Sequence, residues 1–133
     1  MGGFALPDAQ PELYLRWMAY WREVESQMLA HPAVEEVASR EAAPFLRGEV
    51  ATFISSTVGT IVELAMAAKQ QHQEWITPVI DLPDLQTART VAEFVERRGA
   101  WLDSHAGSLG IAPLEPELVA LRSQAIAMLR AAS

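Results

Sequence analysis

Apolar residues recur every three or four positions along most of this chain, and prolines divide that pattern into segments. The longest apolar periodic run that no proline interrupts covers residues 46–75. Spacing of three and four places apolar side chains on one face of a helix, so we expect one long helix there. Residues 50–62 are also rich in β-branched side chains, which makes a strand the competing prediction. The helical spacing continues to residue 75 and favours the helix.

Three more segments carry the same helical period. Prolines near their starts and a glycine after one of them are the usual signals for helix starts and stops. We expect Asp81 to cap the middle one and Gly107 to end it. The three predicted helices cover residues 11–30, 82–106 and 115–131. Between them, the sequence predicts a short acidic connector helix at residues 32–43 and an extended loop at residues 76–83.

Four main helices with short connections predict an all-α fold, an up-and-down antiparallel four-helix bundle with a short extra connector helix. A chain of 133 residues has the size of one domain, so we expect a single unit over residues 1–133. Residues 1–8 lack a basic stretch and a long apolar core, and we expect a loose N-terminus without a targeting signal. Polar residues interrupt the apolar run at residues 50–68, which favours a core helix over a transmembrane segment.

Charge and cysteine content narrow the possible partners. The chain has 10 Lys and Arg against 17 Asp and Glu, a formal net charge of -7. The electrostatic field of this negative charge repels phosphate backbones and anionic membranes, so we expect no nucleic-acid partner. The absence of cysteine excludes disulfides, thiolate nucleophiles and cysteine metal sites, and it fits a cytoplasmic location.

No familiar catalytic or cofactor motif occurs in the sequence, neither a phosphate-binding loop nor a dinucleotide, zinc-protease or nucleophile-elbow motif. The histidines His31, His72 and His105 fall at different ends of the predicted bundle, so we expect no metal site and no cofactor. Glu63 lies on the back of the long helix, where solvation explains a carboxylate better than acid–base catalysis does. The sequence therefore gives no support for an enzyme.

Two arginines interrupt apolar stripes and are the most specific candidates for a binding site. Arg98 lies in the middle of the stripe of the helix at 82–106, and Arg122 lies on the stripe of the last helix. In one interpretation their stems lie on the core and their charged ends reach solvent or a carboxylate. In the other they hold a small anionic ligand in a pocket between the helices. The aromatic walls of that pocket would be Trp17, Trp21 and Trp101.

Association is the leading functional prediction. The apolar arc of the first helix spans about half of its circumference, wider than one neighbouring helix needs. Its aromatic stripe is most often core, but a subunit interface that includes Tyr14 and Met18 is the next interpretation. The back of the long helix carries small residues that permit close approach of another backbone: Thr52, Ser56, Gly59 and Thr60. We therefore expect a small helical protein that acts as a homo-oligomer or as a protein–protein adaptor, with ligand binding as the alternative.

Overall fold

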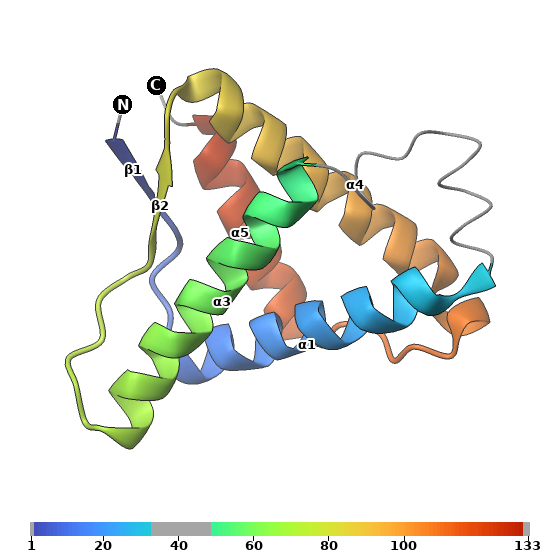
Figure 1. The fold of residues 1–133 in the computed structure, drawn as a ribbon, viewed down its shortest axis with the longest axis horizontal. Coiled ribbons are helices and arrows are strands. Elements are labelled where there is room, and N and C mark those ends of the chain that lie inside the picture. The colour runs from blue at the N-terminus through green and yellow to red at the C-terminus, as the bar shows by residue number, and fades with distance from the viewer. Residues whose placement is uncertain (1, 33–48, 132–133) are drawn as a thin grey trace.

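The structure is a computed structural model that describes residues 2–32 and 49–131 (Figure 1). This part of the chain is mostly helical, as the sequence predicts, with four helices and one small pair of strands. The predicted connector helix at residues 32–43 lies outside the described residues from residue 33 onward. The elements are β1 (Gly2–Ala5), α1 (Pro11–Ala30), α3 (Glu49–Gln70), β2 (Val79–Leu82), α4 (Leu85–Leu109) and α5 (Pro116–Ala131).

Helix α3 is the predicted long helix, and residues 50–62 are helical throughout. The predicted end at residue 75 is wrong, because α3 ends at Gln70 and the backbone reverses at His72, whose φ is 54°. Trp75 follows the helical period but lies in the loop. Its indole Nε1 donates to the Ala9 carbonyl at 2.7 Å, and its ring packs 5.7 Å from that of Tyr14. Trp75 therefore joins the loop to the start of α1.

The N-terminus, predicted to be loose, instead forms β1. It pairs antiparallel with β2 in a register that runs from Gly2 opposite Leu82 to Ala5 opposite Val79. Within β2, the side chains of Ile80 and Leu82 are buried. Strands of four residues show too little alternation to be predicted from sequence, and a two-stranded sheet is marginal alone. Packing on α4 and α5 therefore stabilises this pair.

The boundaries of α4 are shifted by three residues from those predicted. Asp84, rather than Asp81, is the N-cap, and its carboxylate accepts a hydrogen bond from the Thr87 amide at 2.8 Å. That bond holds the pKa of Asp84 below its usual value. The helix continues past Gly107 to Gly110, whose φ of 71° and position at the C-terminus are typical of a left-handed cap. Asp81 instead belongs to β2.

The up-and-down arrangement is not confirmed. Figure 1 shows α1 lying across the end of the molecule where α3 and α5 reach it, rather than alongside them. The closest helix pairs are α1 with α3 and α4 with α5. The wide apolar arc of α1 is the reason, because it packs against more than one neighbour. Trp21, for example, lies 6.4 Å from Phe94 of α4 between ring centroids.

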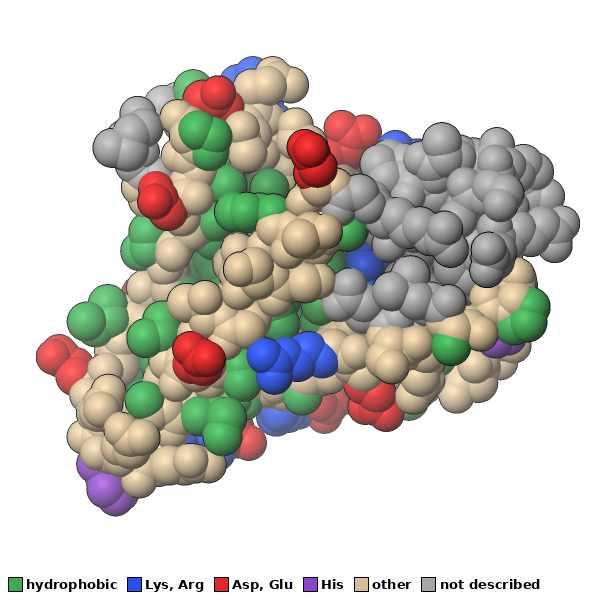
Figure 2. All heavy atoms as spheres, viewed as in Figure 1, with side chains coloured by type: hydrophobic (Ala, Val, Ile, Leu, Met, Phe, Trp, Pro, Cys, Tyr) green, Lys and Arg blue, Asp and Glu red, His purple; other side chains and the backbone are tan. Residues whose placement is uncertain are grey.

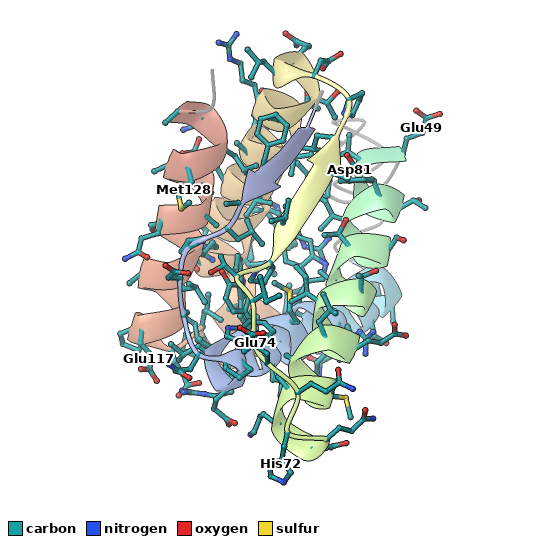
Figure 3. All side chains as sticks on the ribbon, turned by 90° about the vertical axis from the view of Figure 1, so that its left-hand side faces the viewer. Glu49, His72, Glu74, Asp81, Glu117 and Met128 are labelled. Atoms are coloured by element: carbon teal, nitrogen blue, oxygen red, sulfur yellow. The ribbon has the colours of Figure 1, made fainter. Side chains whose placement is uncertain are left out.

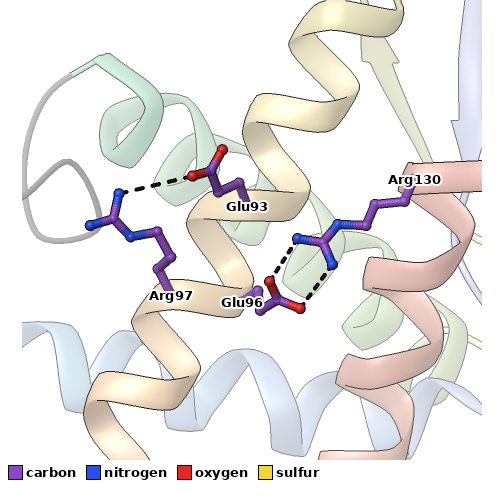
Figure 4. A network of polar contacts seen from close by, with 4 residues as sticks. All are labelled: Glu93, Glu96, Arg97 and Arg130. Atoms are coloured by element: carbon purple, nitrogen blue, oxygen red, sulfur yellow. Dashed lines mark hydrogen bonds and ion pairs between the residues drawn. The ribbon is translucent and has the colours of Figure 1, made fainter.

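Exposed ion pairs join the outer surfaces of the helices. Arg130 of α5 makes two hydrogen bonds to the carboxylate of Glu96 on α4, at 2.6 and 2.9 Å (Figure 4). This pairing lowers the pKa of Glu96 and raises that of Arg130. On α4 itself, Glu93 and Arg97 lie 4.0 Å apart. Such exposed pairs contribute little to stability, so the apolar interior holds the helices together.

Candidate functional site

Arg98, the first candidate ligand-binding residue, lies in the interior. Its side chain comes from the middle of α4, and the residue is 1% exposed. The guanidinium carbon lies 4.3 Å from the centre of the Trp21 ring, within the range of a cation–π contact. Arg98 therefore does not extend into solvent, and α1 covers it with an aromatic face.

Arg122 reaches toward the same region from α5 and is more accessible. Its Nη2 donates to Asp103 of α4 at 3.1 Å, and its side chain is 12% exposed. The guanidinium lies against Gly99, where a Cβ would come within 2.9 Å of the Arg122 Cζ. Sequence reasoning missed Gly99 and Asp103. A glycine in the middle of a helix, directly after a candidate residue, was the available signal.

Four of the five predicted ligand-binding residues line one cavity: Arg98, Arg122, Trp17 and Trp21. The fifth, Trp101, stacks on His105 with ring centroids 4.6 Å apart and is not part of this cavity. The cavity volume is about 20 Å³, room for a single water molecule. Sites for small molecules usually measure about 300 Å³ or more. This cavity, as it stands, holds no carboxylate or phosphate metabolite.

A second cavity lies between the helices and has an almost entirely apolar lining. Its volume is about 50 Å³, and it is lined by residues from all four described helices together with Leu6 and with Ile80 of β2. A water molecule is stable only where it finds polar partners, and a drug-sized ligand needs far more room. This cavity is therefore a packing defect of the core rather than a binding site.

Two of the predicted interface residues are used inside the chain. Tyr14 is 0% exposed, and its hydroxyl donates to the Pro7 carbonyl at 2.5 Å. Burial, with a smaller contribution from the carboxylate of Asp8, raises the pKa of Tyr14. Met18 is also buried. The wide arc of α1 meets α3, the loop before β2 and α4, so these two side chains offer no surface to another subunit.

The other predicted interface residues lie on the outside of α3 or at its edge. Thr52, Ser56 and Thr60 are exposed, and Gly59 is half-buried beside Arg22 of α1. The Thr60 hydroxyl donates to the Ser56 carbonyl at 3.3 Å, one turn earlier on the helix. That bond satisfies a polar group that otherwise disfavours the middle of a helix. This face of α3 is therefore polar, and its short side chains project little from the helix.

Beside this face a groove of about 220 Å³ runs between α3 and β2. Figure 3 shows β2 between β1 and α3, with Glu49 and Asp81 toward the same end of the molecule. Ser56 and Thr60 line the groove on one side, and Val79 and Asp81 line it on the other. The remaining lining residues are Phe53, Thr57, Ile61, Leu64, Pro78 and Ile80.

The groove combines exposed apolar side chains with acidic ones. Leu64 is 53% exposed and Val79 is 59% exposed. Leu64 follows the apolar period of the long helix, but it lies outside the core. Asp81, Glu49 and Glu63 are exposed as well. In Figure 2 hydrophobic side chains are visible on the left of the face, with separate acidic side chains between them.

Neither metal ligation nor similarity to other proteins adds to these observations. Within residues 2–32 and 49–131, no three His, Asp or Glu side chains lie close enough together to hold a metal ion. One described helix, α3, is long and apolar enough by composition to cross a membrane, with a mean hydropathy of 1.5, although no membrane is part of the structure. No protein-family model, curated protein or solved structure matches the chain.

Proposed function

We propose that this protein works by binding another protein in the groove between α3 and β2. The observation that carries the proposal is the exposure of apolar side chains where α3 lies beside β2. Leu64 is 53% exposed and Val79 is 59% exposed, although α3 is the most apolar of the described helices. A helix of that composition in an isolated domain is normally covered on most of its apolar surface. Exposed apolar patches with polar rims are typical of protein-binding sites.

The charges favour a different protein over a second copy of this chain. A twofold interface brings the same patch of the two copies together, so the carboxylates of Glu49, Glu63 and Asp81 would face the acidic patch of the other copy. Like charges that face each other weaken an interface. A membrane is disfavoured for a similar reason, because Glu63 is exposed in the middle of α3 and the chain carries a net charge of -7.

Ligand binding at Arg98 and Arg122 is the weaker alternative. The two arginines face one cavity, but a volume of about 20 Å³ supports a structural water rather than an anionic metabolite. Opening it for a ligand would separate Arg98 from the Trp21 ring. An adaptor-like role in the cytoplasm accordingly remains our proposal.

Site-specific photo-crosslinking in the cells of origin tests the proposal. A photoreactive residue at Thr60 faces the groove, and the same residue at Gln124, exposed on α5, is the matched control. We expect a discrete adduct from Thr60, none from Gln124, and loss of the Thr60 adduct when Leu64→Glu is added. Equal adducts from both positions, or no adduct at all, contradict the proposal. An adduct of twice the chain mass identifies a second copy as the partner.

A further inference from the structure

We propose that the partner enters this groove as an extended, basic segment that adds a third strand to β2. This inference rests on the proposed function and names the chemistry of the partner. The exposed edge of a sheet presents backbone donors and acceptors that pair readily with a strand from another chain. Peptides bind by this route in several recognition domains, where main-chain bonds give affinity and alternate side chains give specificity.

The strand register shows which backbone groups face the groove. The Leu6 amide donates to the Pro78 carbonyl at 2.9 Å, so the backbone groups of these two residues face each other across the sheet. In an antiparallel pair, residues with bonds across the ladder alternate with residues whose groups point the other way. Two steps along, Ile80 therefore bonds to β1 opposite Phe4. The amides and carbonyls of Val79 and Asp81 consequently point away from β1.

Those outward groups belong to residues that line the groove. Val79 and Asp81 line it, and the opposite wall is α3, where Ser56 and Thr60 are small. A groove of about 220 Å³ gives room beside the edge that the rest of the described chain does not fill. Side chains of an added strand alternate between two faces. One set would lie against the exposed side chains of Val79 and Leu64, and the other would face solvent.

The charges around the edge select a basic segment. Asp81 lies on β2 itself, and Glu49, Ser56 and Glu63 follow one another at intervals of seven residues along α3. That interval places the two glutamates along the same side of the helix as Ser56, which lines the groove. Among the described residues that line the groove, none is basic. Lysine or arginine flanking a short apolar stretch complements this arrangement.

The strand pair also gains from a third strand. Each strand has four residues, and two-stranded sheets of that size are marginal without further packing. An added strand pairs the outward groups of β2 and makes it the centre of a three-stranded sheet. Binding is therefore expected to slow hydrogen exchange at the amides of Val79 and Asp81 in particular, rather than evenly over α3.

Short synthetic peptides provide the first test. The probe is a peptide of alternating valine and threonine with lysine at both ends, followed by amide-resolved hydrogen exchange and chemical shifts of the intact protein. One control replaces the lysines by glutamates, and a second carries N-methyl groups on alternate amides and cannot pair. We expect saturable binding of the lysine peptide alone, weakened by salt, with protection centred on Val79 and Asp81.

Two substitutions at one position test the backbone contact in the protein. Asp81→Pro removes the outward amide of β2, and proline is tolerated at an edge amide that makes no ladder bond. Asp81→Asn keeps that amide and removes the same charge. We expect the proline variant to bind the lysine peptide about tenfold more weakly than the asparagine variant, the effect of one lost hydrogen bond. Should the proline variant fail to fold, the N-methylated peptide makes the same comparison on the wild type.

The outcomes separate this inference from the proposed function. If crosslinks form at Thr60 but the bound partner leaves the Val79 and Asp81 amides exchanging as before, the groove binds a protein and strand addition is wrong. Equal binding of the lysine and glutamate peptides overturns the charge argument. If both the crosslinks and the peptide binding are absent, the proposed function and this inference fail together.

Discussion

Arg98 is the charged side chain that the described part of the chain buries most completely, and it is the clearest case at the scale of one residue. It is 1% exposed and covers the Trp21 ring. We expect Arg98→Ala to lower the free energy of unfolding by about 3 kcal/mol, since it leaves a void and removes the ring contact. Arg98→Met fills most of the void and should recover at least half of that loss. Urea unfolding measures both, and an alanine variant as stable as the wild type contradicts this role.

Tyr14 gives a second residue-scale prediction, for alkaline pH. Its folded-state pKa lies above the ordinary value of 10.0, because burial disfavours the phenolate. As the pH rises past 10, the unfolded chain loses this proton before the folded protein does. The contribution of Tyr14 to the free energy of unfolding is therefore fully present below pH 10. Above pH 10 the free energy of unfolding falls by about 1.4 kcal/mol per pH unit. Urea unfolding from about pH 8 to pH 11 measures the slope, and Tyr14→Phe removes the part that Tyr14 contributes.

The other tyrosine is the control for that experiment. Burial also raises the pKa of Tyr20, which is half-buried and lies near Asp103 and Arg122. Since the sequence contains 2 tyrosines, Tyr20→Phe leaves the Tyr14 contribution by itself. If the slope survives Tyr14→Phe and disappears with Tyr20→Phe, Tyr20 causes the pH dependence and the prediction for Tyr14 is wrong.

At the scale of an element, the pairing of β1 with β2 depends on Gly3. A Cβ on Gly3 would overlap Cγ1 of Val79, which leans over the glycine. We expect Gly3→Ala to cost about 1–2 kcal/mol, as overpacking usually does. Val79→Ala alone should cost little, because Val79 is 59% exposed. The double variant should recover most of the loss in a double-mutant cycle measured by urea unfolding. Additive effects would mean that the two side chains do not meet.

At the scale of the whole molecule, the acidic face of α3 and β2 predicts that the isolated chain does not pair with itself. We expect a monomer in sedimentation velocity at about micromolar concentration and low salt, where repulsion between like charges is strongest. Leu64→Glu in the groove and Met128→Glu on α5 are matched variants, since both wild-type residues are exposed. A wild-type dimer that only Leu64→Glu dissociates would show that a second copy occupies the groove.

The sequence by itself determined the local elements and the directions of several side chains. The period of the apolar residues predicted α1, α3, α4 and α5 within a few residues. It also identified Arg98 and Arg122 as unusual, and the structure places both beside one cavity. These features follow from neighbours on one helix, which a single sequence contains in full.

Only the tertiary structure decided what covers each apolar face and how much space is left between them. The pairing of β1 with β2 joins residues as distant in sequence as Gly2 and Leu82, and neither strand is long enough to be predicted from its own pattern. Trp75 follows the helical period, yet it lies in a loop, where its indole donates a hydrogen bond to the Ala9 carbonyl. The periodic pattern says which side chains avoid water, and it does not say which element shields them. Tertiary contacts therefore bury Tyr14 and Met18 in the core and leave Leu64 exposed in the groove.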